Sequence, residues 1–153
     1  MASEDNGRIV VGVDGSEHAR RALDWAVREA RLRGTSVVAV HAYAVPPVYL
    51  APEPVLATPP ALPDPELIER LEGSGRKLLE EEVGRVDAEG VTIEQRVAAG
   101  SAADALVQAA REGDLLVVGS RGLGGFRGLL LGSVGQQVAH HAPCPVVIVP
   151  ARD

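Results

Sequence analysis

Short apolar runs alternate with longer amphipathic segments along this chain, and this alternation constrains the fold more than any other feature. The runs at 8–14 and 114–120 are continuous and rich in valine, leucine and isoleucine. Such runs are typical of parallel strands that helices cover on both faces. The order of the elements therefore predicts an α/β fold with a mostly parallel sheet and helices on both faces. We expect strands at 8–14, 35–42, 91–97, 114–120 and 145–149, and helices at 17–33, 64–88, 101–111 and 133–141.

Several residues mark where these helices begin and end. Gly34 stands where a glycine C-cap belongs, directly after the first helical segment. Asp64 is placed as an N-cap, with Pro65 at the first helical position. Ser133 and Gln136 have the spacing of a capping box, so we expect Ser133 to cap the last helix.

A chain of 153 residues suits one domain with a sizeable core. We expect that domain at 8–150, after a disordered lead-in at 1–7. The segment 43–63 contains seven of the eleven prolines, and proline fixes φ and removes a backbone donor. This segment is therefore expected to be a long irregular loop inside the domain.

Composition narrows the classes of partner and compartment. No run of 18 apolar residues exists, so we expect no membrane-spanning segment, and a net charge of −6 disfavours a nucleic-acid-binding face. Cys144 is the only cysteine, which excludes an internal disulfide and fits the cytoplasm. One lysine against fourteen arginines, with abundant alanine, glycine and valine, indicates a GC-rich bacterial genome.

Glycine is concentrated at 117–135, where it supplies seven of nineteen residues. The stretch has no lysine for a Walker phosphate loop, and Arg127 stands where the dinucleotide fingerprint needs its third glycine. The spacing that remains is Gly119-x₂-Gly122-x₉-Gly132-Ser133. Glycines directly after a strand allow backbone N–H groups to approach a ligand closely.

The second half of this spacing opens a helix. Gly132, Ser133 and Val134 lie at its start, where the first N–H groups are unpaired and the helix dipole attracts anions. Arg121 and Arg127 could add charge-assisted bonds. From spacing alone, a phosphate site and a surface loop with an ordinary capped helix are equally good interpretations.

The pattern G-x₂-G-x₉-G-[S/T] after a buried strand resembles the nucleotide-binding signature of the universal stress protein family. The segments RIVVGVDGSEHARRALDWA, VVAVHA and PCPVVIV resemble that family's first strand and helix, second strand and final strand. The resemblance implies a Rossmann-like open sheet of five parallel strands in the order 3-2-1-4-5. Strands one and four would then meet at the topological switch point, where open α/β sheets bind ligands.

The resemblance also implies a set of site residues. Asp14 would lie by the adenosine, close to Gly119, and the backbone of Ala42 would line the adenine pocket. Asp14 could instead, or also, cap the first helix, with Glu17 three residues on. The complete implied set is Gly12, Val13, Asp14, Ala42, Val118, Gly119, Ser120, Arg121, Gly122, Gly132, Ser133 and Val134.

These residues favour an ATP-binding universal stress protein that acts as a nucleotide-dependent sensor or regulator of the stress response. The ligand would be ATP, or AMP or ADP, with Mg²⁺ on the phosphates. We expect no catalytic residue and at most slow hydrolysis, because no water-activating base is placed by a motif. The alternatives are a nucleotide-independent interaction protein and a slow ATPase.

Two further features concern metals and assembly. His140, His141 and Cys144 lie close in sequence, but neighbouring helical residues point in different directions and no fourth ligand is present, so we expect no metal site. The apolar strand at 145–149 would be an exposed sheet edge, and the resemblance implies a homodimer through it.

Overall fold

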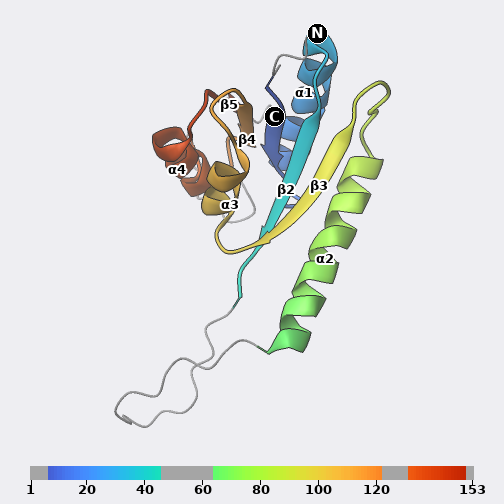
Figure 1. Ribbon diagram of the computed structural model, residues 1–153, viewed down its shortest axis with the longest axis vertical. Coiled ribbons are helices and arrows are strands. Elements are labelled where there is room, and N and C mark those ends of the chain that lie inside the picture. Colours follow the sequence, from blue (N-terminus) through green and yellow to red (C-terminus); the bar gives the residue numbers. More distant parts are fainter. Residues whose placement is uncertain (1–6, 46–63, 122–130, 151–153) are drawn as a thin grey trace.

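The computed structural model describes residues 7–45, 64–121 and 131–150, and Figure 1 shows how their elements are arranged. Its five strands form one parallel sheet in the order β3-β2-β1-β4-β5, which confirms the expected fold and topology. The strands are β1 Ile9–Gly12, β2 Val37–Tyr43, β3 Ile93–Ala99, β4 Leu115–Gly119 and β5 Val146–Val149. The helices are α1 Glu17–Arg33, α2 Pro65–Gly84, α3 Ala102–Ala109 and α4 Ser133–His141.

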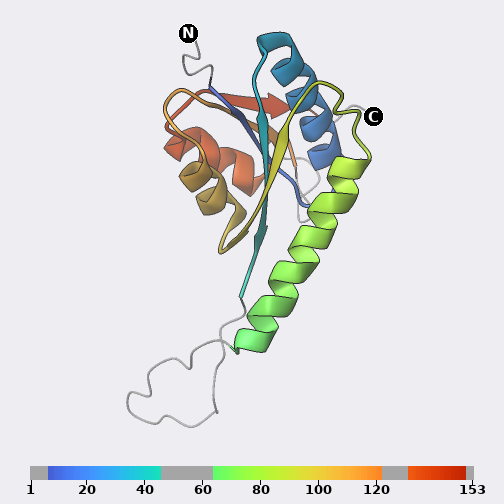
Figure 2. The same ribbon diagram turned by 45° about the vertical axis from the view of Figure 1, so that its right-hand side comes forward.

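Helices cover both faces of the sheet, with α1 and α2 on one face and α3 and α4 on the other (Figures 1 and 2). The side chains of β1 alternate between the two cores, so that Ile9 and Val11 pack under α1 while Val10 packs under α3. All three are completely buried. This double burial explains why the strand reads as a continuous apolar run.

The N-terminus of α1 excludes one of the two roles considered for Asp14, that of helix cap. Ser16, not Asp14, is the N-cap, and its hydroxyl oxygen accepts a hydrogen bond of 3.1 Å from the backbone N–H of Ala19. Asp14 acts one step earlier, because its carboxylate accepts from the N–H and the hydroxyl of Ser16. At the other end of α1, Gly34 adopts the left-handed conformation expected of a C-cap, with φ 68°.

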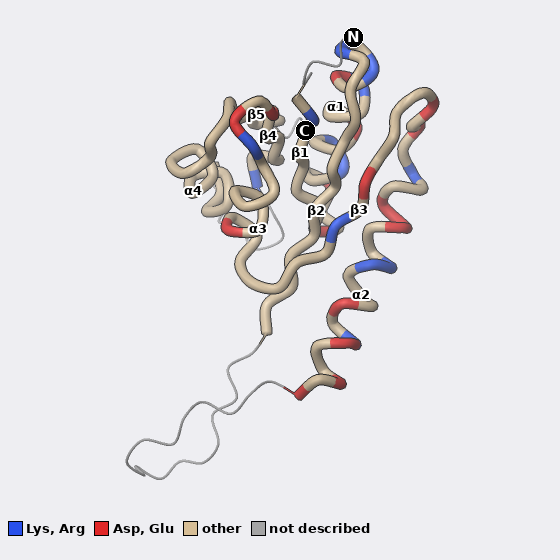
Figure 3. The backbone as a smooth tube through the Cα atoms, in the orientation of Figure 1, with Lys and Arg blue, Asp and Glu red and all other residues tan. Residues whose placement is uncertain are grey.

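Helix α2 begins as expected, with the Asp64 side chain accepting from the N–H of Glu66 and with Pro65 in the first turn. It ends at Gly84 rather than near residue 88. The chain then tightens into a turn, in which Gly90 has φ 80°. Acidic and basic residues are interspersed along this helix (Figure 3). The expected proline-rich loop, 43–63, lies outside the described residues from position 46 onward.

Within the described part of the chain, no helix is both long enough and apolar enough to cross a membrane.

Candidate functional site

The strand β1 ends earlier than its neighbours, and this leaves a gap at the carboxyl edge of the sheet. Its pairing with β2 stops at Gly12↔Val40, and its pairing with β4 stops at Val11↔Val117. β2 continues to Tyr43 and β4 continues to Gly119 on either side. The gap therefore coincides with the switch point between β1 and β4, the usual ligand position in such sheets.

On the β2 side, the gap exposes the peptide edge of Ala42. Tyr43 accepts a hydrogen bond from beyond the end of β3, so Ala42 turns its N–H and C=O the other way, toward the line of β1. The N–H of Val13 still reaches the carbonyl of Val40 at 2.8 Å, but this is the last rung. In the described part of the chain, no backbone hydrogen bond joins Ala42 to β1.

Asp14 is fixed at the turn that leaves β1. Its Oδ1 accepts from the backbone N–H of Ser16 at 2.9 Å and from the Ser16 hydroxyl at 2.5 Å. Gly15 between them has φ 83°, a conformation that favours glycine. The turn holds a half-buried carboxylate at the same sheet edge as Ala42.

On the β4 side, Gly119 lies against the first turn of α1. A Cβ built on Gly119 would lie 2.8 Å from the carbonyl oxygen of His18 and 2.9 Å from its carbonyl carbon. Gly119 thus lies against the helix that follows Asp14, although about a hundred residues separate Gly119 from Asp14 in sequence. The missing Cβ gives room to the α1 backbone, a reason for glycine that the sequence did not reveal.

The start of α4 is tied to the end of β4. The N–H of Gly132 donates to the carbonyl of Ser120 at 2.7 Å, and Ser120 in turn donates to Val149 of β5 at 3.0 Å. The first hydrogen bond within α4 runs from Gln136 to Gly132. The three N–H groups between them, at 133–135, have no acceptor in the helix and are directed out of its N-terminus.

The expected capping box at this helix is wrong. Gly132 is the N-cap, and Ser133 is the first helical residue with an exposed side chain. The Gln136 side chain donates instead to the carbonyl of Leu131 at 3.0 Å. The reason is that Gly132 already has the extended backbone of a cap, with φ −71° and ψ 172°. The Ser133 hydroxyl forms no hydrogen bond with the described residues.

The remaining implied residues divide by burial. Val13, Val118 and Ser120 are buried, and a Cβ on Gly12 would touch Leu106 of α3, so none of these four presents an exposed side chain to a ligand. Arg121 is half-buried. Gly122 and Arg127 lie outside the described residues.

Sequence reasoning missed His41, whose Nδ1 lies 2.8 Å from the carbonyl oxygen of Val13 at the edge of the gap. The available signal was a single polar residue near the end of the apolar run VVAVHA. A polar side chain in such a run usually has a buried hydrogen-bond partner.

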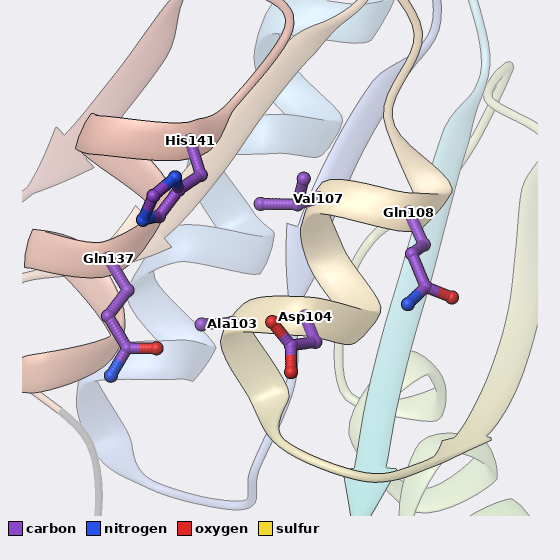
Figure 4. A pocket seen from close by; sticks show the side chains of 6 residues that line it. All are labelled: Ala103, Asp104, Val107, Gln108, Gln137 and His141. Atoms are coloured by element: carbon purple, nitrogen blue, oxygen red, sulfur yellow. The ribbon is translucent and has the colours of Figure 1, made fainter.

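Two cavities lie elsewhere on the described surface. Figure 4 shows one of about 130 Å³ between α3 and α4, where Asp104 and Gln137 approach from opposite helices. The other, of about 330 Å³, lies between α2 and β3. Neither is lined by a residue of the implied set. The first is lined by Ala103, Asp104, Val107, Gln108, Gln137 and His141, and the second by Glu72, Arg76, Leu79, Glu80, Gln95, Arg96 and Val97.

Comparison with known proteins places this geometry in a family. Residues 6–150 match the sequence profile of the universal stress protein family. A universal stress protein of Thermus aquaticus is 40% identical over 147 residues, which cover 92% of this chain and 96% of that protein. A universal stress protein of Mycobacterium tuberculosis is 33% identical over 95% of this chain, which spans only 48% of that relative's length.

Solved structures give the same result. A universal stress protein in complex with cAMP is 34% identical, with a TM-score of 0.63 and coverage of 94% of this chain and 95% of the other. A universal stress protein of Archaeoglobus fulgidus in complex with dAMP is 28% identical, with a TM-score of 0.61 and coverage of 94% and 97%. The sequence profile, the relatives and the fold agree, and the chain therefore belongs to the universal stress protein family.

Proposed function

We propose that this chain binds an adenine nucleotide, ATP or its shorter relatives AMP and ADP, in the gap between β1 and β4. The observation that carries the proposal is that backbone donors at Ala42 and at the first turn of α4, on either side of this gap, have no backbone acceptor among the described residues. One set suits a base and the other suits phosphates. The proposed contacts are those of the twelve residues that the family resemblance implies.

The base would pair with the peptide edge of Ala42. A strand residue offers its N–H and C=O side by side, which is one donor next to one acceptor. Adenine offers the complementary pair, with N1 as acceptor and the N6 amino group as donor. The carboxylate of Asp14, fixed by Ser16, would accept a hydrogen bond from a ribose hydroxyl.

The phosphates would lie at the N-terminus of α4. Several N–H groups point outward there, from Ser133 and Val134 among others, and the helix dipole favours an anion. The Ser133 hydroxyl could supplement them, as could Arg121, which directly follows the Ser120 that is bonded to Gly132. Mg²⁺ would bind as part of the nucleotide, bridging phosphate oxygens.

The relatives support this assignment. The two related structures described above are complexes with cAMP and dAMP, which both carry adenine. We infer a sensor or regulator of the stress response, in which nucleotide binding changes the order of the site, with at most slow hydrolysis. A nucleotide-independent interaction protein is the alternative.

A pair of proline substitutions tests the phosphate end. Proline is tolerated at the first position of a helix, and the preceding residue must be extended. Both Gly132 before Ser133 and Ser101 before Ala102 meet this requirement, with ψ 172° and 149°. Ser133→Pro removes one N–H and one hydroxyl from the proposed site, whereas Ala102→Pro removes only the equivalent N–H, at the start of α3.

The measurement is isothermal titration with ATP and Mg²⁺. Hydrogen bonds to charged groups contribute about 1.5–3 kcal/mol, so Ser133→Pro should raise the dissociation constant roughly tenfold or more. Ala102→Pro should bind like the wild type. Equal binding by wild type and Ser133→Pro contradicts the proposed phosphate site. No binding of ATP, ADP or AMP by the wild type contradicts the function and favours the interaction protein.

We further propose a homodimer through β5. This strand is the last in the sheet, and its four residues are apolar and only partly buried. The N–H of Leu116 donates to the carbonyl of Pro145, so the backbone groups of residues 145, 147 and 149 face β4. The backbone groups of Val146 and Ile148 face the open edge of the sheet. An uncovered apolar edge favours pairing with a second copy.

Sedimentation at micromolar concentration tests this proposal, with a dimeric mass expected. Ile148→Pro removes an outward N–H that the β4 ladder does not use, so it should give a folded monomer. A monomeric mass for the wild type excludes the dimer.

A further inference from the structure

The end of β1 departs from a regular parallel ladder at one hydrogen bond. In a regular ladder, the Val13 carbonyl would accept from the N–H of Ala42, two residues beyond the last pair, Gly12↔Val40. That carbonyl instead has the imidazole Nδ1 of His41 at 2.8 Å. The side chain therefore occupies the acceptor that the next backbone donor would use.

The chemistry of this contact fixes the role of each atom. A carbonyl oxygen can only accept, so Nδ1 of His41 must carry the hydrogen and donate it. Neutral imidazole has one N–H, and the ring therefore leaves Nε2 as an acceptor. The bond needs no charge on the ring, because the neutral tautomer already supplies the donor.

Helix α2 fixes the position of the ring. A Cβ added to Gly75 would lie 3.0 Å from Cδ2 of His41 and 2.9 Å from Cγ1 of Val97. Gly75 is buried, and no residue larger than glycine fits there without moving its neighbours. Gly73, one half-turn earlier, has no atom within 4 Å of its added Cβ. Only Gly75 therefore has a packing reason to be glycine in this part of α2.

We propose that His41 is a positioning residue that keeps the ladder between β1 and β2 open, and so reserves the N–H of Ala42 for the base of the nucleotide. The inference rests on the proposed function for the identity of the ligand, but not for the opening of the ladder. His41 contacts no nucleotide in this scheme and acts through the Val13 carbonyl.

The proposal assigns His41 an effect on base selectivity. Adenine presents an acceptor at N1, which the Ala42 N–H can meet. Guanine has N1–H at that position and a carbonyl in place of the amino group. Its N1–H would therefore face the N–H of Ala42, donor against donor, and its carbonyl would face the C=O of Ala42, acceptor against acceptor. Loss of His41 would allow Ala42 to pair with Val13, and the site would then lose its preference for adenine over guanine.

The test compares four variants with the wild type. His41→Leu removes the donor, and His41→Asn keeps an N–H donor near the position of Nδ1. Gly75→Ala adds a methyl group on α2 that displaces the imidazole ring of His41. Gly73→Ala is the matched control in the same helix. Circular dichroism first confirms that each variant is folded, and Gly75→Ala replaces His41→Leu if the latter fails to fold.

The first measurement needs no nucleotide. Amide hydrogen exchange at Ala42 should be fast in the wild type, His41→Asn and Gly73→Ala, and slowed at least tenfold in His41→Leu and Gly75→Ala. Unchanged exchange at Ala42 in both folded variants would overturn the proposal, whatever the protein binds.

The second measurement is the ratio of the dissociation constants for GTP and ATP. The loss of one hydrogen bond to the base should reduce this ratio roughly three- to tenfold in His41→Leu, with recovery in His41→Asn. A ratio unchanged from the wild type overturns the selectivity role. If the wild type binds neither nucleotide, the proposed function fails, and amide exchange alone still decides whether His41 opens the ladder.

Discussion

Replacing Gly119 by alanine places a methyl group against the backbone of α1. The added Cβ lies 2.8 Å from the oxygen and 2.9 Å from the carbon of the His18 carbonyl, and 3.0 Å from His18 Cβ. Favourable contacts between such atoms need about 3.5–4.0 Å. Gly119 is not among the described glycines with positive φ, so alanine can adopt its backbone conformation and the conflict is one of space alone.

The first turn of α1 cannot easily move away. The Ser16 hydroxyl accepts from Ala19, and the Ser16 carbonyl accepts from Arg20 at 3.0 Å, so His18 is held on both sides. Overpacking of a fixed site costs about 1–3 kcal/mol. Alanine also restricts the unfolded chain, which offsets about 0.4–1 kcal/mol. We therefore expect a net loss of about 1–2 kcal/mol in the free energy of unfolding.

Urea denaturation of Gly119→Ala and Gly73→Ala tests this reasoning, because the free energy of unfolding should fall in the first variant and rise in the second. Gly73 lies within α2 with no atom near its added Cβ, so alanine there should stabilise the protein by about 0.5–1 kcal/mol. In thermal unfolding, a loss of 1–2 kcal/mol corresponds to a fall of about 2–8 °C for a chain of this size. A Gly119→Ala protein as stable as the wild type would refute the packing argument.

Three other substitutions or reactions test the described structure. Burial alone would raise the pKa of Asp114, but hydrogen bonds from Arg8 and from the Arg111 backbone outweigh it and hold this pKa below its usual range. The ion pair therefore stabilises the fold fully above about pH 4 and loses this effect as the pH falls through the folded pKa. Asp114→Asn should cost about 3 kcal/mol at pH 7 in urea denaturation, and a difference that persists undiminished at pH 2 contradicts the reasoning. The buried Nδ1 of His18 has no hydrogen-bond partner among the described residues, so His18→Leu should be neutral or stabilise by up to about 1 kcal/mol in thermal unfolding, and a clear loss would show a missing partner. Burial and then the charge of Asp114 raise the pKa of the Cys144 thiol, so iodoacetamide at pH 8 should modify it more slowly than free cysteine, and equal rates would refute this.

The topology could be predicted from the sequence because its cause is local. Continuous apolar runs such as 8–14 occur where both faces of a strand are buried, and helical segments between them force parallel pairing. The strand order came from the resemblance, and the register of each pair is visible only in the structure. The helix starts at Asp64 and Ser101 could also be predicted, because each capping side chain accepts a hydrogen bond from a backbone N–H no more than three residues further along the chain.

Contacts distant in sequence could not be predicted. The contact of Gly119 with α1 joins segments about a hundred residues apart, and nothing near Gly119 distinguishes a packing glycine from a ligand-binding one. The pairing of His41 with Val13 depends on where β1 leaves the sheet, which was expected at Asp14 but occurs at Gly12. The capping box at Ser133 failed because the spacing cannot reveal that Gly132 already has the cap conformation.

The residues of the glycine signature therefore differ in what they say about a ligand. Gly119 is required by the packing of α1, so its presence would be expected in this fold even if no nucleotide were bound. Ser133 has no such role, because its side chain is exposed and forms no hydrogen bond with the described residues. Serine is also a weaker helix former than alanine. It follows that Ser133→Ala should weaken ATP binding while leaving the stability of the fold unchanged or slightly improved. Gly119→Ala, in contrast, should reduce the stability of the fold whether or not a nucleotide is bound. Unfolding and titration of these two variants would separate the part of the signature that the fold needs from the part that only a ligand explains.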